Sequence, residues 1–97
     1  NPPYIKNLDL KYLEKDVIKF EPNLALNGGL DGISEIRKVI KKSSELIKNG
    51  GKLILEIAHT QKKEVKQLLR KNGFYINFII KDLAKNDRCI ISTKIHN

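Results

Sequence analysis

Two segments of the chain have the apolar spacing of amphipathic helices. Over Ile33–Lys48, apolar residues recur every three or four positions, and the Asn-Gly-Gly sequence that follows is predicted to end the helix. A second segment, about Gln61–Lys71, has the same spacing, and Thr60 is placed to cap its first turn through the hydroxyl group. The pattern therefore predicts two helices, each with one face turned toward a core.

Three segments have the patterns of strands. Lys52–Ala58 is almost continuously apolar, which is typical of a parallel strand buried on both faces. Phe74–Lys81 alternates, so its apolar even-numbered residues are predicted to share one face. Arg88–Lys94 is predicted to be the last strand, whereas the first 30 residues show neither period and are predicted to be mostly irregular. The alternation of helices and strands is typical of an α/β fold, about half of a doubly wound sheet.

Composition narrows the classes of function. The chain has 97 residues, a net charge of +8 and no apolar run long enough for a membrane span. One cysteine, Cys89, excludes an internal disulfide and fits a reducing compartment, the cytoplasm. The positive residues are nearly all lysines spread along the sequence, which favours a solvated surface over a nucleic-acid footprint. A basic surface could still help to dock an acidic face of a protein partner. No cluster of histidines, cysteines or carboxylates has the spacing of metal ligands, so no metal is expected.

The chain begins with Asn1-Pro2-Pro3-Tyr4, a set of residues suited to holding an amide group. Two consecutive prolines remove backbone donors and fix φ, so the carbonyls of Asn1 and Pro2 stay free as acceptors. The Asn1 side chain adds an acceptor and a donor, and Tyr4 adds a flat ring with a polar tip. Two acceptors match the two N–H bonds of an amide, and the ring matches its plane. A rigid surface turn is the alternative that the tetrapeptide alone leaves open.

The tetrapeptide resembles the active-site motif of methyltransferases that modify a planar nitrogen, and further motifs follow it. These are Phe20-Glu21-Pro22, Ala25-Leu26, Gly28-Gly29-Leu30-Asp31-Gly32 and Lys81-Asp82-Leu83-Ala84 with Asp87-Arg88. In order and spacing, they resemble the C-terminal half of the HemK family, the protein-(glutamine-N5) methyltransferases that act on peptide chain release factors. The resemblance covers the chain from Asn1 to about Ser92.

The resemblance implies the C-terminal half of a class I S-adenosylmethionine-dependent methyltransferase fold, which is Rossmann-like. Lys52–Ala58 would be a parallel strand, and an antiparallel terminal pair would place Arg88–Lys94 beside it, with helices flanking the sheet. Residues 1–97 would form one C-terminal part of a catalytic domain. Within it, 1–30 would be the active-site loop region and 31–97 the α/β sheet and helices.

For the site, the resemblance implies that Asn1 and Pro2 accept the two N–H bonds of a substrate glutamine, through a side-chain oxygen and a carbonyl. Tyr4 would pack on the amide plane, and Pro3 would stiffen the loop. The reaction implied is transfer of a methyl group from S-adenosylmethionine to the side-chain nitrogen of a glutamine in release factors.

Two further residues and the cofactor site are implied less directly. Glu21 and Pro22 would shape a lid over the substrate, with a simple turn as the alternative. Asn1 would also contact the cofactor, but this chain has neither the Gly-rich turn nor the acidic residue that family members carry before Asn-Pro-Pro-Tyr. We therefore expect a fragment that lacks most of the S-adenosylmethionine site and is inactive alone. Without the preceding strand, one edge of Lys52–Ala58 would be bare, which predicts self-association through that exposed sheet edge.

Two alternatives remain open from the sequence. One is a non-catalytic basic α/β module that binds protein or RNA. The other is a methyltransferase that acts on amino groups of nucleic acid, since such enzymes have a similar tetrapeptide.

Overall fold

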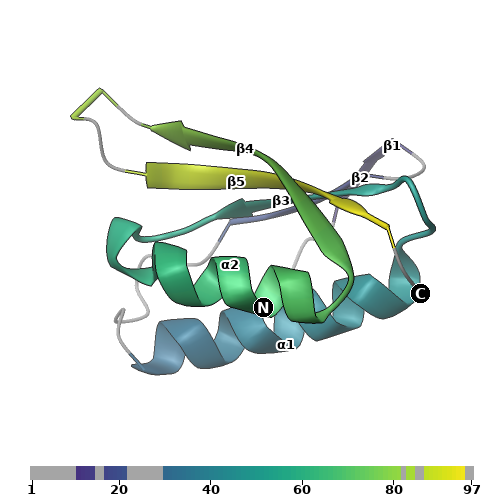
Figure 1. The fold of residues 1–97 in the computed structure, drawn as a ribbon, viewed down its shortest axis with the longest axis horizontal. Helices are drawn as coiled ribbons and strands as arrows, with labels where there is room; N and C mark the ends of the chain where they lie inside the picture. Colours follow the sequence, from purple (N-terminus) through teal and green to yellow (C-terminus); the bar gives the residue numbers. More distant parts are fainter. Residues whose placement is uncertain (1–10, 15–16, 22–29, 82, 85–86, 96–97) are drawn as a thin grey trace.

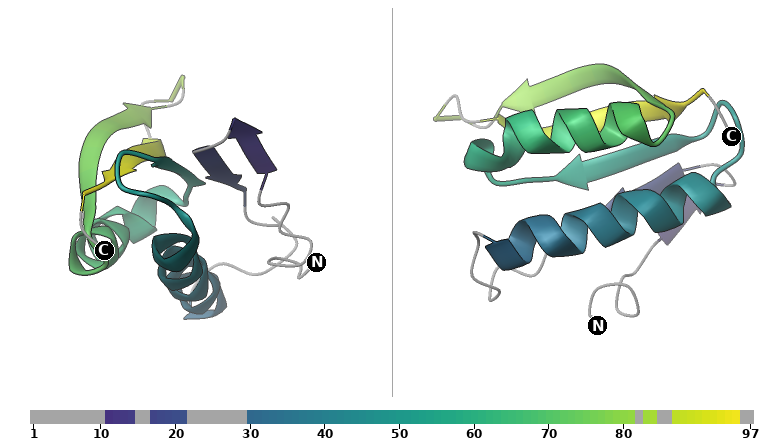
Figure 2. Two further views of the ribbon diagram at one scale, coloured as in Figure 1. Left: turned by 90° about the vertical axis from the view of Figure 1, so that its right-hand side faces the viewer. Right: turned by 60° about the horizontal axis from the view of Figure 1, so that its bottom comes forward.

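The computed structural model describes residues 11–14, 17–21, 30–81, 83–84 and 87–95. Over this range, the chain forms one mixed sheet with helices α1 (Leu30–Leu46) and α2 (Lys62–Lys71) on the same face (Figures 1 and 2). The strands are β1 (Lys11–Glu14), β2 (Val17–Phe20), β3 (Lys52–Glu56), β4 (Phe74–Lys81) and β5 (Asp87–Lys94). The predicted α/β architecture is confirmed.

The strand order is β1-β2-β3-β5-β4. Strand β5 lies between β3 and β4 and runs antiparallel to both, as expected for an inserted last strand. Strands β2 and β3 are parallel, and β1 pairs with β2 in the antiparallel sense. Because β2 and β3 are parallel, their carboxyl ends lie side by side at one end of the sheet. Ligand sites of such sheets form beyond these carboxyl ends.

Two expectations about the first part of the chain are wrong. The first 30 residues are not mostly irregular where the structure describes them, because Lys11–Glu14 and Val17–Phe20 are strands. In addition, the edge of β3 is not exposed, because β2 hydrogen-bonds along it from Val17 opposite Lys52 to Phe20 opposite Leu55. An occupied edge cannot recruit a second chain, so the reason for expecting self-association there is removed.

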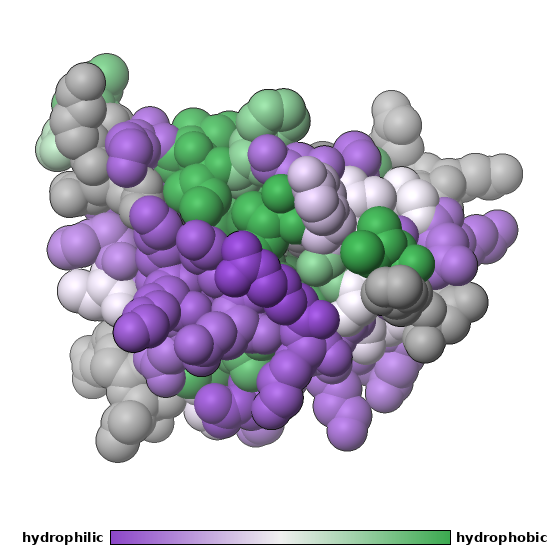
Figure 3. All heavy atoms as spheres, in the orientation of Figure 1, coloured by the Kyte–Doolittle hydropathy of each residue, from purple (hydrophilic) through white to green (hydrophobic). Residues whose placement is uncertain are grey.

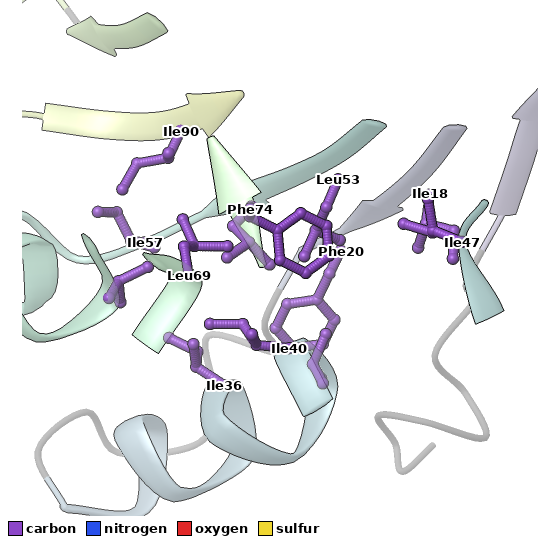
Figure 4. Packing of buried hydrophobic residues seen from close by; sticks show 13 residues of the cluster. Ile18, Phe20, Ile36, Ile40, Ile47, Leu53, Ile57, Leu69, Phe74 and Ile90 are labelled. Carbon is purple, nitrogen blue, oxygen red and sulfur yellow. The ribbon is translucent and has the colours of Figure 1, made fainter. Parts of the chain in front are cut away.

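The core lies between the sheet and the two helices. Alternate residues of β2 and β3 point into it, so Phe20, Leu53 and Leu55 are fully buried. They pack against apolar residues of the helices, among them Ile40 and Leu69 (Figure 4). The intervening residues of β3 are only half-buried, because helices cover one face of the sheet in the described part of the chain. The prediction that this strand is buried on both faces is therefore wrong.

A β-bulge divides strand β4 into two halves. Ile76 lies opposite Ser92, but Phe78 lies opposite Ile91, so one extra residue, Asn77, interrupts the pairing. The side-chain alternation changes phase there. Phe78 is 65% exposed, while Ile79 packs against the core. The prediction that all even-numbered residues of β4 share one face is correct before the bulge and wrong after it.

Asn72-Gly73 ends α2, as predicted, whereas α1 ends at Leu46, before the Asn-Gly-Gly sequence that was predicted to end it. Gly50 and Gly73 have φ angles of 90° and 86°, a left-handed conformation that other residues adopt only with strain. The start of α2 differs from the prediction. A short 3₁₀ turn, His59–Gln61, precedes the helix, and no side-chain hydroxyl caps it. The Gln61 side chain instead closes the 3₁₀ turn, since its Oε1 accepts the N–H of Ala58 at 3.0 Å.

Candidate active-site edge of the sheet

The carboxyl ends of β2 and β3 form the candidate site. Because the strands are parallel and Phe20 lies opposite Leu55, Glu21, which follows β2, and Glu56, the last residue of β3, lie at the same edge of the sheet. Open α/β sheets bind their ligands beyond the carboxyl ends of parallel strands. The structure therefore brings the Phe-Glu segment of the sequence to the edge where ligand chemistry is expected.

Glu21 is fixed at this edge by its neighbours. Phe20 before it is fully buried and anchors the end of β2 in the core. The Glu21 carboxylate lies 3.0 Å from Lys19 Nζ, and the two side chains are 54% and 43% exposed. The hydrogen bond from Lys19 to Glu21, aided by their charges, raises the pKa of Lys19. An ion pair this exposed adds little stability, so it orients Glu21 rather than holding the fold together.

The turn after β3 packs against the start of α1 through the side chain of Gln61. Gln61 is 7% exposed, its N–H donates to the Ala58 carbonyl at 2.8 Å, and its side chain receives the Ala58 N–H. The other end of the same amide lies over Gly32, where a Cβ would stand only 2.7 Å from Nε2. Gly32 is thus the position at which the first turn of α1 makes room for Gln61. We call this packing of Gln61 against Gly32 the clasp.

The side chains beside the clasp show no catalytic cluster among the described residues. Glu56 is half-buried and lies directly opposite Cys89 on the face of the sheet that the helices do not cover. Burial, followed by the charge of Glu56, raises the pKa of the Cys89 thiol, which makes it a poor nucleophile. His59 is exposed in the 3₁₀ turn. No group of three or more potential metal ligands occurs in the described ranges.

The remaining predicted site residues, Asn1, Pro2, Pro3, Tyr4 and Pro22, lie outside the described residues. Their roles therefore remain predictions. Sequence reasoning missed the contact between Gln61 and Gly32, although Gly32 belongs to a segment that carries the family resemblance. It also missed strand β2, which places Glu21 at the edge. Of the helices that the structure describes, none is long and apolar enough to cross a membrane.

Curated proteins similar to this chain share one name. The chain is 37% identical over 94 residues to the release factor glutamine methyltransferase of Thermodesulfovibrio yellowstonii, which covers 97% of this chain and 34% of that protein. It is 43% identical over 94 residues to the protein of the same name from Clostridium botulinum, covering 97% and 33%. The chain thus spans about a third of the length of the curated relatives that it matches. No family model matches it.

Solved structures show the same fold. A release factor-specific protein-(glutamine-N5) methyltransferase from Alicyclobacillus acidocaldarius superposes with a TM-score of 0.62 over 94% of this chain and 58% of its own, at 24% identity. A methyltransferase from Pyrococcus furiosus gives 0.66 over 84% and 41%, at 22% identity. The architecture is that of a partial Rossmann-like methyltransferase fold of class I. Over nearly its whole length, the chain is a homologue of the release factor glutamine methyltransferases.

Proposed function

We propose that this chain supplies the substrate-amide site of a release factor glutamine methyltransferase. Such an enzyme transfers a methyl group from S-adenosylmethionine to the side-chain nitrogen of a glutamine in a peptide chain release factor. The observation that supports this proposal most directly is the similarity of nearly the entire chain to relatives with that name, at 37% and 43% identity. The tetrapeptide Asn1-Pro2-Pro3-Tyr4 supplies the matching chemistry.

Methyl transfer to an amide nitrogen depends on the positioning of the amide more than on a catalytic base. An amide nitrogen is a poor nucleophile because its lone pair is delocalised into the carbonyl. In our proposal, the Asn1 side-chain oxygen and the Pro2 carbonyl accept the two N–H bonds and aim the nitrogen at the methyl group. Tyr4 packs on the amide plane, and Pro3 keeps the loop stiff. The rate then comes from orientation and from preorganised acceptors.

The fold is compatible with this arrangement. The edge formed by β2 and β3 is where an α/β sheet binds ligands, and Glu21 stands on it in an ion pair with Lys19. We propose that Glu21 and Pro22 form part of a lid over the substrate amide. The clasp between Gln61 and Gly32 supports the same edge from the side of α1.

The described residues do not by themselves fit S-adenosylmethionine. The parallel strand β3 is followed by Ala58 and a 3₁₀ turn with no glycine, whereas nucleotide-type cofactors need a Gly-rich turn that opens a helix. Of the residues present, Asn1 is the one that we propose to contact the cofactor. The rest of the cofactor site would be supplied by other parts of a longer enzyme. We place such an enzyme in the cytoplasm, where its release-factor substrates would be.

The test is methyl transfer by a full-length enzyme that carries this segment. Asn1→Ala should lower kcat about 10²–10³-fold, as expected for loss of one preorganised polar contact, and should leave cofactor affinity within about tenfold. Asn49→Ala is the matched control, because Asn49 is exposed and precedes the opposite end of β3. Activity of Asn1→Ala within a few-fold of the parent would show that Asn1 is only a turn residue. A parent that transfers no methyl group to release factors would instead favour a non-catalytic binding module.

A further inference from the structure

One flank of helix α2 is almost entirely basic. Two neighbouring rows, each spaced by four residues, run along it, and five of their six positions are cationic. The rows are Lys62, Lys66 and Arg70, and Lys63, Gln67 and Lys71. We call the five cations the basic flank. All five are exposed or half-exposed beside Val65 and Leu69, whose burial in the core fixes which way the helix faces.

Only part of this placement of charge serves the helix itself, since Arg70 and Lys71 stand in the last turn, where the helix dipole favours cations. Like charges four residues apart destabilise a helix, and the rows contain two such pairs, Lys62 with Lys66 and Lys66 with Arg70. Lys62 and Lys63 also stand in the first turn, where the helix dipole favours negative charge. The cations of the first turn and the pairs four residues apart lower the stability of the helix, so a charged partner explains their placement better than the helix does.

The basic flank starts at the candidate site. Helix α2 follows the 3₁₀ turn at the carboxyl end of β3. Within the basic flank, Lys62 and Lys63 are therefore nearest to the candidate site, and Arg70 and Lys71 are farthest from it. A hollow along this flank is lined by His59, Lys63, Lys66 and Arg70 (α2 in Figure 1). Figure 3 shows hydrophilic side chains gathered in the lower part of the view, where α2 lies in Figure 1, below an area of hydrophobic ones. A partner seated over the edge could therefore extend along the flank.

The chemistry of the flank favours an acidic protein surface over nucleic acid. Lysines are hydrated point charges, whereas bidentate phosphate recognition uses arginine, and the flank has one arginine. No aromatic residue lies within α2 to stack on a base. Clusters of this kind speed the approach of an oppositely charged protein and fix its orientation.

We propose that the basic flank of α2 docks an acidic surface of the protein substrate while its glutamine occupies the site at the sheet edge. The proposal rests on the proposed function. It adds a second contact, away from the chemistry, that recognises the intact substrate protein and not a short peptide.

The experiment compares two triple charge reversals of equal composition in a full-length enzyme that carries this segment. One is Lys63→Glu with Lys66→Glu and Arg70→Glu on α2. The other, on the exposed side of α1, is Arg37→Glu with Lys41→Glu and Lys42→Glu. Both change the net charge equally. Initial rates are measured with an intact release factor and with a short glutamine peptide, across a series of salt concentrations.

The α2 variant should raise KM for the intact release factor about tenfold or more and leave kcat unchanged. It should weaken the salt dependence and leave the peptide kinetics unchanged, while the α1 variant stays within about threefold of the parent. Equal effects of the two variants, or none from either, would overturn the proposal. So would loss of RNA binding in a gel-shift assay without any change in KM for the release factor.

Two controls separate the possible failures. A parent enzyme that methylates no release factor refutes the proposed function, whereas an active parent with an equally active α2 variant refutes only the docking surface. Circular dichroism reports whether the charge-reversed helix still folds. If it does not, the neutral set Lys63→Gln, Lys66→Gln and Arg70→Gln takes its place, with an expected rise in KM of about threefold or more.

Discussion

The buried lysine at the end of β5 offers the sharpest test of the fold. Lys94 is 2% exposed, and its Nζ donates to the Ser44 carbonyl in the last turn of α1 at 2.8 Å. Helix α1 has no basic residue of its own in that turn. Lys94 thus brings a positive charge from the sheet to the negative end of the helix dipole, and its ammonium lies 6.0 Å from the centre of the Phe74 ring.

The magnitude follows from these contacts. A hydrogen bond from a charged donor contributes about 1.5–3 kcal/mol, and a partly buried charge at a helix C-terminus contributes up to about 2 kcal/mol. Lys94→Met keeps the stem and removes the charge, which also removes the cost of keeping that charge out of water. We expect Lys94→Met to lower the free energy of unfolding by about 1–2 kcal/mol. Lys94→Ala, which also leaves a cavity, should lower it by about 3–4 kcal/mol.

Urea denaturation measures the difference. With an m-value of about 1 kcal/mol per M for a small chain, Lys94→Met should lower the midpoint by about 1–2 M. Lys48→Met is the matched control, because Lys48 follows the same helix but is exposed, and its effect should stay below about 0.5 kcal/mol. If Lys94→Met is as stable as the parent while Lys94→Ala is not, the stem alone contributes and the charge does not.

Three further predictions follow from other contacts. Gly32→Ala should leave stability nearly unchanged in the parent, because the gain in helix propensity offsets the displaced Gln61 amide; in a Gln61→Ala background, thermal denaturation should show a gain of about 0.5–1 kcal/mol. Beyond the bulge in β4, Ile79→Ala should cost about 2 kcal/mol and Phe78→Ala less than about 0.5 kcal/mol in the isolated chain, and the reverse ranking would show that the bulge is absent. Calorimetric titration of the chain with S-adenosylmethionine should give a Kd no tighter than about 1 mM, worth about 4 kcal/mol, and low-micromolar binding would contradict the cofactor assignment.

Local periodicity predicted most of the regular structure because it depends on residues close in sequence. The helical spacing before Asn49 and before Asn72 survives in α1 and α2, and Gly73 follows directly after the end of α2 at Asn72. Strand β2 was missed because a strand of four residues is too short to display a period. Its pairing with β3 depends on tertiary contacts between distant segments, and the spacing of residues along the sequence does not encode them.

The parts of the site that were missed depend on contacts between distant segments. Gln61 reaches Gly32 only because the turn after β3 packs against the start of α1, and no local pattern predicts that approach. The sequence did contain a signal that the Lys94 side chain is buried. Lys94 has the same parity along β5 as the buried residues Ile90 and Ser92, so alternation alone placed its side chain inward. A general preference of lysine for solvent obscured that signal.

The charge of the chain shows how a spatial pattern can be hidden in a sequence. Read in order, the lysines are spread evenly, and that spacing favoured a solvated surface without a target. The helical period changes this conclusion for α2. Burial of Val65 and Leu69 fixes the orientation of the helix, and the cations before, between and after these two residues then share one flank. The only carboxylate of the helix, Glu64, lies outside both basic rows. The same spacing that builds the core therefore separates the charges on the outside, and a binding surface can arise without any basic run longer than two residues.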